Sequence, residues 1–259
     1  MAIILNRLPE GMKPDRTKVC LNMIVRDEAH CIERCLRSVL PFISSWVIVD
    51  TGSTDNTVEI IREVLKDVPG EVFEREWKDF GWNRTEALHL AKQWTKHTGN
   101  YSRYLMFVDA DEVFHGDLSG IQNQDVYSMS IGEANSESRR LFFAKMHLPL
   151  WFRGRVHEAL TCETDAPVDY MASGYVSTDS CGGRHQKEGW REAEIKEILK
   201  DNQKDPRVIF HLAQMLEAAG YLDAALKAFI LRRRMGGDEY EMGVSKARIA
   251  HLELDDVAS

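Results

Sequence analysis

The hydrophobic residues in the first half of the chain form short apolar runs that alternate with segments of helical spacing. The runs Val19–Val25 and Trp46–Val49 are rich in β-branched, aromatic and other large apolar residues, as is typical of strands inside a sheet. Residues 29–40 between them have helical periodicity, and Pro41 ends that segment because its ring cannot continue a helix. This part of the sequence therefore predicts a strand–helix–strand unit.

The same alternation continues to about residue 115. A helix is predicted to begin near Val58, a strand to cover residues 72–77, and a helix to cover residues 83–96 with Asn83 as its N-cap. A further apolar run follows at residues 104–108. The resulting βαβαβαβ pattern predicts an α/β fold with a mostly parallel sheet covered by helices.

The pattern changes after Phe114. The segments DVYSMSI and RRLFFAKMHL predict a hairpin or meander, and from Gln186 onward the spacing is helical only. From Pro206 the chain resembles one tetratricopeptide repeat followed by a partial one, although an ordinary helical hairpin is the alternative. Since fewer than three repeats seldom stand alone, we expect this tail to pack against the rest of the chain. The residues that fit the repeat are Ile209, Leu212, Ala213, Leu216, Gly220, Ala225 and Phe229.

The expected organisation is an N-terminal extension over residues 1–17, an α/β domain over 18–186 and a helical region over 187–259. With 259 residues, 44% of them hydrophobic, the chain can bury a large core. No apolar run is long enough to cross a membrane, and the one at the N-terminus is too short for a secretory signal. Five cysteines without a CxxC pair predict free thiols. We therefore expect a soluble, cytoplasmic protein.

The charge of the chain bears on its partners. A net charge of −8 disfavours a protein whose main task is to grip nucleic-acid backbone. Two groups of basic residues remain of interest. One, Arg232–Arg234, is interpreted as a solvated face, whereas the other is a candidate contact for diphosphate or an anionic acceptor. The second group is Arg139, Arg140, Lys145, Arg153 and Arg155.

A long polar turn follows the strand predicted at Trp46–Val49. It reads DTGSTDNT, from Asp50 to Thr57, and helical spacing resumes at Val58. In open α/β sheets, ligands bind where strand ends meet helix N-termini, because free backbone amides face outward there. The length and polarity of this turn predict a ligand-binding loop.

Two aspartates follow the apolar run at residues 104–108. Asp109 and Asp111 lie two positions apart, so in an extended strand their side chains would point to the same side. Paired carboxylates at a strand end suit a hard divalent cation that keeps positions open for phosphate oxygens. Such a pair is weak evidence alone, but Asp50 ends a second strand of the same predicted sheet. Together these residues indicate a metal and phosphate site.

Four segments, in order, resemble the nucleotide-sugar half of a family 2 glycosyltransferase with the GT-A fold: LNMIVRDEAHCIERCLRSV, VIVDTGSTDNT, FGWNRTEAL and LMFVDADE. Three later segments, WFRGRVHEAL, GGRHQKEGW and DPRVIFHLAQ, resemble the bacterial and viral branch with a C-terminal tetratricopeptide-like region. The resemblance covers about residues 18–250. It implies a Rossmann-like, mostly parallel sheet with helices on both faces, followed by a small all-α tail.

The resemblance also implies an activity. Such enzymes transfer a hexosyl or pentosyl group from a nucleotide sugar, with UDP-sugar favoured here, to a hydroxyl-type acceptor with inversion. Mn²⁺ or Mg²⁺ would bridge the two phosphates and stabilise the leaving group. The acceptor stays open between a glycan, a peptide and a modified base in viral DNA. Protein contacts are expected through the helical tail.

The family motifs assign roles to residues of this chain by position. Asp109 corresponds to the aspartate near the ribose and the metal, and Asp111 to the direct metal ligand. The donor-binding residues implied in this way are Asn22, Val25, Arg26, Glu28, Asp50, Gly52, Ser53, Asp55, Asn83, Arg84, Asp109 and Ala110.

The third metal ligand and the general base are less well defined. His157 follows a predicted strand and is our candidate ligand, with His185 and Asp179 as competitors. Glu158 is our candidate base for the acceptor hydroxyl, the alternative being a structural salt bridge to Arg153 or Arg155. Adjacent residues on a regular strand point to opposite faces, so His157 and Glu158 could not both enter one site there.

Two other functions remain as alternatives. One is a nucleotidyltransferase acting on sugar phosphates, which would be expected to carry a glycine-rich, basic N-terminal loop that LNMIVRDEAH lacks. The other is a non-catalytic nucleotide-binding scaffold built around the tail. Hydrolysis of a nucleotide sugar in the presence of Mn²⁺ would distinguish a transferase from such a scaffold.

Overall fold

The computed structural model describes residues 19–100, 102–178, 182 and 188–258. The expected N-terminal extension, Asp179, Cys181 and His185 lie outside the described residues. The chain divides into two compact units. The sheet unit comprises the described parts of Met1–Glu76, Glu86–Pro149 and Cys162–Gly182. The helical unit comprises the described parts of Trp77–Thr85, Leu150–Thr161 and Gly183–Ser259.

In the described residues, the sheet unit is built on one sheet of eight strands. Four of its neighbouring pairs are parallel, including β3 with β2, β2 with β1, and β1 with β4. The antiparallel pairs are β4 with β7, β7 with β6, and β10 with β5. The order across the sheet is β3 (Gly70–Glu74), β2 (Ser45–Asp50), β1 (Val19–Val25), β4 (Tyr104–Phe107), β7 (Arg139–Lys145), β6 (Val126–Ile131), β10 (Val168–Thr178) and β5 (Glu112–Gly116).

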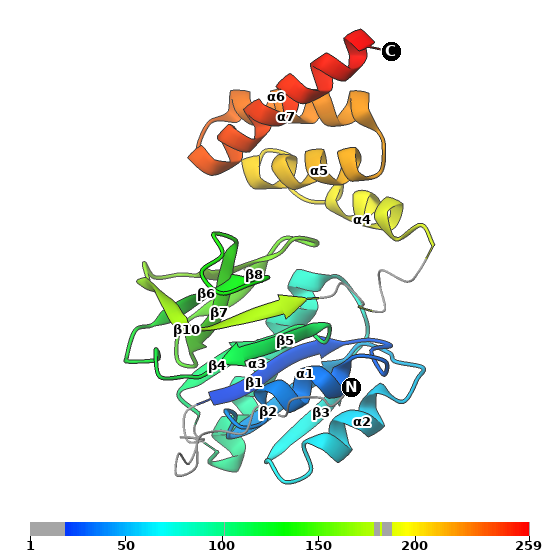
Figure 1. Cartoon of the computed structure of the whole chain (residues 1–259). Helices are drawn as coiled ribbons and strands as arrows, with labels where there is room; N and C mark the ends of the chain where they lie inside the picture. The colour runs from blue at the N-terminus through cyan, green and yellow to red at the C-terminus, as the bar shows by residue number, and fades with distance from the viewer. Residues whose placement is uncertain (1–18, 101, 179–181, 183–187, 259) are drawn as a thin grey trace, which may run out of the picture. The chain divides into compact units, whose positions relative to one another are not determined.

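Helices cover both faces of this sheet (Figure 1). Helices α1 (Ile32–Val39) and α2 (Thr57–Val64) pack on one face, where Leu21 and Met23 of β1 belong to the same buried cluster as Leu36. Helix α3 (Phe80–Thr98) packs on the other face. The expected fold class, a mostly parallel α/β sheet followed by helices, is confirmed.

The start of α3 differs from the prediction. The helix begins at Phe80, so Asn83 is a buried residue inside its first turn rather than its N-cap. Asp79 takes the capping role instead, since its Oδ1 accepts a hydrogen bond from Trp82 N at 2.8 Å. Asn83 Oδ1 accepts from Lys78 N at 2.9 Å, which fixes the preceding chain.

The helical unit contains α4 (Trp190–Ile198), α5 (Pro206–Ala218), α6 (Leu222–Met235) and α7 (Glu239–Ala258). Asp205 caps α5 by accepting from Arg207 N, and a proline occupies its first turn, as helix N-termini favour. Ala213, Ala225 and Phe229 are buried between the helices, in agreement with the large and small spacing in the sequence.

The last change of unit falls between Gly182 and Gly183, near the boundary expected at residue 186, but the helical unit also includes two earlier segments. Residues 77–85 and 150–161 group with the C-terminal helices, although they lie far before them in the sequence. Arg155 joins all three segments: its guanidinium pairs with Asp79 and Glu197, and its backbone N donates to Asp201 Oδ2. The two-stranded ribbon of β8 (Leu150–Arg153) and β9 (Ala159–Cys162) begins in this unit.

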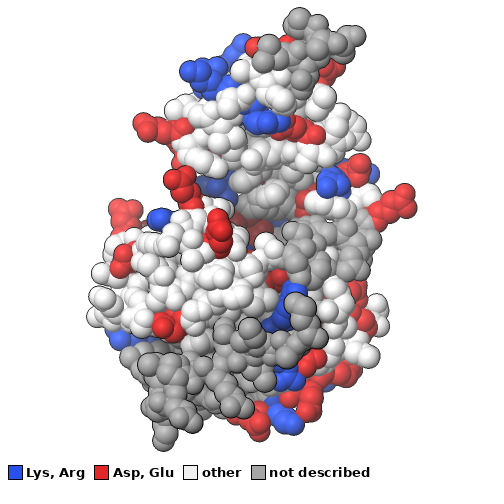
Figure 2. Space-filling model, viewed as in Figure 1, with Lys and Arg blue, Asp and Glu red and all other residues white. Residues whose placement is uncertain are grey.

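The structure agrees with the expected free thiols but not with the expected exposure of Arg232. Acidic and basic side chains are interspersed on the face shown in Figure 2. Arg232, expected on a solvated face, is instead fully buried, with its Nε 2.9 Å from Glu241 Oε2. None of the described helices is long and apolar enough to cross a membrane. The described cysteines are free thiols: Cys20, Cys31, Cys35 and Cys162.

Gly70 provides a test of the packing between β2 and β3. A Cβ at this position would lie 2.2 Å from the ring of Trp46, whose Nε1 donates to Val68 O. Gly70→Ala should therefore lower the free energy of unfolding by about 2 kcal/mol, the typical cost of overpacking. Gly243→Ala is the control: it lies in α7 with nothing near its Cβ, and should raise stability by up to about 1 kcal/mol. Urea unfolding would measure both, and an unaffected Gly70→Ala protein would contradict the packing.

Candidate functional site

The carboxyl ends of β2, β1 and β4 meet at one edge of the sheet. The three strands are adjacent and parallel, and Val25 at the end of β1 pairs with Asp50 at the end of β2. The loops that follow these strands therefore lie together, as ligand-binding loops do in open α/β sheets. They carry most of the donor-binding residues expected from the sequence.

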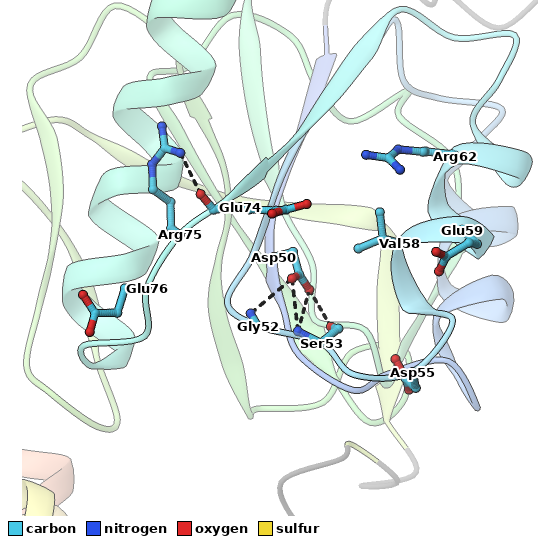
Figure 3. Close-up of a pocket in the computed structure, with 10 residues that line it drawn as sticks. All are labelled: Asp50, Gly52, Ser53, Asp55, Val58, Glu59, Arg62, Glu74, Arg75 and Glu76. Carbon is cyan, nitrogen blue, oxygen red and sulfur yellow. Dashed lines mark hydrogen bonds between the residues drawn. The ribbon is translucent and has the colours of Figure 1, made fainter.

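Asp50 organises the loop after β2. Its carboxylate accepts hydrogen bonds from Gly52 N at 3.1 Å, from Ser53 N at 3.1 Å and from Ser53 Oγ at 2.5 Å (Figure 3). Gly52 has φ +102°, a conformation that disfavours a side chain. The acidic side chain and the glycine together explain why this turn is long and polar.

A second set of hydrogen bonds ties this loop to the loop after β1. Asp27 Oδ1 accepts from Thr54 N at 2.8 Å, and Asp55 Oδ2 accepts from Ala29 N at 3.0 Å. Thr57 Oγ1 accepts from Glu28 N at 2.8 Å and donates to Asp55 Oδ1. Desolvation opposes ionisation of Asp55, but the bonds from Thr57 and Ala29 outweigh it and lower the pKa of Asp55. The two loops therefore form one rigid platform.

A cavity of about 510 Å³ opens beside this platform, between the ends of β2 and β3 and helix α2 (Figure 3). Its size falls in the usual range for small-molecule sites. The lining is strongly charged and combines carboxylates with two guanidinium groups. The residues around it are Asp50, Gly52, Ser53, Asp55, Val58, Glu59, Arg62, Glu74, Arg75 and Glu76.

Two of the expected nucleoside contacts are buried in the core. Asn22 is 3% exposed, and its amide donates to Val47 O at 3.2 Å and to Ala87 O at 3.0 Å. Val25 is also 3% exposed and belongs to the core cluster. Their side chains hold β1 in place, so a direct contact to a ligand does not follow from their positions. Arg26 is more accessible, with 47% of its side chain exposed.

The segment after β4 is a turn rather than an extended strand. β4 ends at Phe107, and Glu112 N donates to Asp109 O at 3.1 Å, which closes the chain on itself. The expectation that Asp109 and Asp111 point to one side because they continue a strand is therefore wrong in its geometry. Ala110 lies buried between them. Each aspartate has its own surroundings.

Arg140 of β7 holds Asp109. Its Nη1 lies 2.9 Å from Asp109 Oδ2, and its Nη2 forms an ion pair with Glu112 Oε2. Glu112 Oε2 also accepts from Asp109 N at 2.9 Å, so both acidic residues share one clamp. Burial raises the pKa of Glu112 to about 7, although the Arg140 charge opposes this rise. Sequence reasoning missed Glu112 because it treated the DADE segment as a metal motif alone.

Asp111 lies in different surroundings from Asp109. Its Oδ2 is 3.5 Å from the hydroxyl of Thr178, and a Cβ at Gly182 would lie 3.3 Å from the same oxygen. Arg34 contacts its backbone carbonyl at 3.5 Å. A carboxylate oxygen facing a hydroxyl and a glycine offers room and charge for a hard cation. The donor atoms at this position therefore fit a divalent ion better than those of Asp109.

The sequence also suggested a basic patch that could contact diphosphate or an anionic acceptor, made of Arg139, Arg140, Lys145, Arg153 and Arg155. These residues do not form a single anion-binding surface. They are paired separately: Lys145 with Asp125, Arg153 with Asp205, and Arg155 with Asp79 and Glu197. The Arg139 guanidinium lies 3.8 Å from the centre of the Tyr170 ring. These residues serve mainly to hold segments together.

Arg84 and Glu158 meet within the helical unit. Arg84 Nε lies 2.5 Å from Glu158 Oε1, and both side chains are 14% exposed. The expected salt bridge of Glu158 therefore exists, but with Arg84 rather than with Arg153 or Arg155. The pair joins the first turns of α3 to the loop between β8 and β9.

His157 lies in the same loop and not on a regular strand. Its φ is +52°, so the argument that neighbouring strand residues face opposite sides does not apply. Its ring stacks on His211 of α5, with the centroids 4.6 Å apart and the planes 8° from parallel. Burial and the nearby charges of His157 and Arg207 lower the pKa of His211 to about 3. The described contact of His157 is therefore a stack on an imidazole whose pKa is lowered, and its role as a metal ligand stays a prediction.

Residues 20–123 match the sequence model of Glycosyl transferase family 2. The SPbeta prophage-derived glycosyltransferase SunS of Bacillus subtilis is 27% identical over 162 residues, covering 56% of this chain and 35% of SunS. A TPR repeat-containing protein of Synechococcus elongatus is 35% identical over 96 residues, covering 37% of this chain and 21% of that protein.

Solved structures show weaker similarity. Staphylococcus aureus TarS 1–349 in complex with UDP has 14% identity and a TM-score of 0.47, covering 93% of this chain and 91% of that chain. Glucosyl-3-phosphoglycerate synthase from Mycobacterium tuberculosis in complex with Mn²⁺ and UDP-glucose has 14% identity and a TM-score of 0.35, covering 52% and 59%. Both TM-scores lie below 0.5.

Glu112 should make the stability of the protein depend on pH. The folded state raises its pKa from the ordinary 4.5 to about 7 and so binds the proton more tightly than the unfolded chain. The stabilising contribution is full below about pH 4.5 and is lost as the pH rises through 7. Urea unfolding over this range should show a pH slope that is flatter in Glu112→Gln, which keeps the size of the side chain. An identical slope in the variant would show that Arg140 keeps Glu112 ionised throughout.

The family match covers β1 to β5 and therefore the platform, the Asp109–Glu112 turn and the strands that position them. The chain as a whole spans about a third of the length of SunS, the curated relative it matches, since 35% of that protein is covered. The similarity to the glycosyl transferase family 2 model is confined to residues 20–123.

Proposed function

We propose that this protein is a metal-dependent glycosyltransferase that moves a sugar from a nucleotide-sugar donor, a UDP-sugar in our assignment, to a hydroxyl-type acceptor with inversion. One observation carries the proposal. Asp50 ends β2, and Asp109 and Asp111 follow β4, two strands that both pair in parallel with β1 inside a segment that matches family 2. A cavity of about 510 Å³ opens beside Asp50. A nucleotidyltransferase or a scaffold has no comparable support.

The nucleoside would bind at the platform formed by the loops after β1 and β2. Asp50 is already fixed by Gly52 and Ser53, so it presents its carboxylate without having to be ordered on binding. Preorganised groups bind more tightly because less conformational entropy is lost. Gly52 would let a ligand approach the backbone closely, since no side chain covers it. Arg62 and Arg75 on the cavity wall add positive charge.

Asp111 would hold the divalent metal, Mn²⁺ or Mg²⁺. Its Oδ2 faces a hydroxyl rather than a guanidinium group, whereas Asp109 is clamped by Arg140. When bound, the metal would neutralise charge that develops on the diphosphate leaving group. Asp109, whose carboxylate is held by the ion pair with Arg140, would contact the ribose of the bound nucleotide sugar. His157, His185 and Asp179 remain candidates for a further ligand, the last two outside the described residues.

Glu158 is our candidate general base. A base must start in its ionised form, and the ion pair with Arg84 is compatible with that form. The same pair also holds the carboxylate in one orientation, so Arg84 would position Glu158 rather than bind the donor directly. The acceptor, whether a glycan, a peptide or a modified base in viral DNA, is left open. Because SunS is described as prophage-derived, a modified base in viral DNA stays among the candidate acceptors.

The first test concerns the nucleoside. Asp50→Ala removes a carboxylate that orders its own loop, so UDP should bind at least about tenfold more weakly even without metal, the usual cost of losing a charged hydrogen bond. Glu59→Ala is the matched control, because it removes a carboxylate from the α2 side of the same cavity. Calorimetric titration with UDP would measure both variants. Equal affinity of Asp50→Ala and the wild type would contradict the nucleoside site.

The second test concerns the metal. Asp111→Asn keeps the size of the side chain but removes its charge, so turnover of UDP-sugar should fall by at least about a hundredfold while UDP binding without metal stays near normal. EDTA should cause the same loss in the wild type and little further loss in the variant, since both changes disable one unit. Asp117→Asn, an exchange on the loop after β5, is the control. Full activity of Asp111→Asn, or activity indifferent to EDTA, would overturn the metal-dependent mechanism.

A further inference from the structure

Three different metal-binding side chains gather just before α1. Glu28, His30 and Cys31 each offer one ligand atom, and these three atoms lie within 4.8 Å of one another. Among the described residues, no other group of three His, Cys, Asp or Glu side chains comes this close together. The group combines a carboxylate oxygen, an imidazole nitrogen and a thiol sulfur. Cys31 is buried, Glu28 is partly buried and His30 is exposed.

The geometry is already near that of a metal site. Cys31 Sγ lies 3.3 Å from Glu28 Oε2. A tetrahedral zinc ion, with bonds of roughly 2.0–2.3 Å, separates its sulfur and oxygen ligands by about 3.5 Å. Two of the three ligand atoms therefore stand at the required separation. A ring nitrogen of His30, whose side chain is exposed, lies within 4.8 Å of both of these atoms.

The backbone of this segment is fixed by bonds described above. Glu28 N donates to Thr57 Oγ1, and Ala29 N donates to Asp55 Oδ2. Cys31 N and Ile32 N both donate to Glu28 O. Ligands on a rigid backbone lose little entropy when they close on an ion. The fixed segment therefore favours tight binding once the right metal is supplied.

We propose that Glu28, His30 and Cys31 form a binding site for a thiophilic divalent cation, Zn²⁺ in the first place, separate from the site of the catalytic metal. Thiolate and imidazole ligands select zinc over the hard ions Mg²⁺ and Mn²⁺. Three protein ligands leave a fourth position for water. The proposal does not depend on the glycosyltransferase assignment, because it concerns only these side chains.

The other described cysteines do not offer such a site. Cys20 and Cys35 are fully buried, and burial raises the pKa of both thiols, that of Cys20 to about 12. Cys162 lies near Thr164, with its Sγ 3.2 Å from the hydroxyl, and belongs to no three-ligand group in the described residues. Cys31 is also buried, at 4% exposure, but Glu28 and His30 lie beside it, and Cys162 is the natural control.

The zinc site would adjoin the donor site. A Cβ at Gly182 would lie 3.8 Å from Glu28 Oε1 and 3.3 Å from Asp111 Oδ2, so both carboxylates flank this glycine. Glu28 faces Cys31 with its other oxygen. Zinc bound there would neutralise charge next to Asp111 and tie down the loop after β1. Zinc could in this way act on the donor site without occupying it.

Cobalt spectroscopy tests the site directly. Co²⁺ added to the untagged, reduced full-length protein should produce a near-ultraviolet sulfur-to-cobalt charge-transfer band that Zn²⁺ removes. Co²⁺ bound by aspartates alone gives no such band, so the catalytic site does not interfere. The band should disappear in Cys31→Ser, persist in Cys162→Ser, and require at least tenfold more Co²⁺ in His30→Ala.

Thermal unfolding provides a second measurement that does not rely on spectroscopy. Zn²⁺ should raise the Tm of the wild type and of Cys162→Ser but not of Cys31→Ser, since an ion that binds only the folded state stabilises it. The absence of a charge-transfer band, its persistence in Cys31→Ser, or unchanged cobalt affinity in His30→Ala would each overturn the proposal. Loss of the band in Cys31→Ser together with the loss of the Tm shift would support it.

Discussion

The hydrogen bonds between the loops after β1 and β2 are the interaction on which the candidate site depends. Asp27, Asp55 and Thr57 each join one loop to the other, and Asp50 closes the second loop on itself. Parallel strands bring loops to one edge of a sheet, but they do not fix their conformation. Here short polar side chains do so, because they can accept several backbone N–H groups within a few residues. The nucleoside site and the zinc site that we propose both rest on this framework.

A second constraint acts on the acidic turn after β4. Two carboxylates, Asp109 and Glu112, lie close to the core and would repel each other without compensation. Arg140 supplies that compensation from β7, a strand far along the chain. Its guanidinium group is suited to two carboxylates because it presents several donors in a fixed plane. Arg140 holds the carboxylate of Asp109, whereas the Asp111 carboxylate lies beside the Thr178 hydroxyl, and this difference divides the roles of the two aspartates.

The sequence predicted the features that depend on nearby residues. The Val19–Val25 strand, the polar turn after β2 and the strand before Asp109 follow from apolar runs and turn residues, and all are present. It missed β10, whose alternating residues pair with both β6 and β5, and it extended β4 through Asp109. It also misplaced the N-cap of α3, because Asp79 and Asn83 are both good capping residues and only the tertiary structure selects between them. The predicted anion-binding role of the basic patch was wrong because its basic side chains contact other residues of the protein that are brought near them only by the fold.

Features that depend on residues near in sequence are easier to predict than features that depend on distant ones. For this reason, residues that would bind the donor are easier to assign than residues that would bind the acceptor. The donor platform consists of two loops 26 to 29 residues apart in sequence, inside the segment that matches family 2. Glu158 meets Arg84 across 74 residues, in a unit assembled from three separate segments, the last of which carries the C-terminal helices. Most of that unit lies outside the matched segment. Substitutions in α4 or α5 can therefore move the loop that carries Glu158 without changing any family motif. The residues around Glu158, our candidate base, therefore depend on long-range contacts in the helical unit, most of which lies outside the segment that matches family 2.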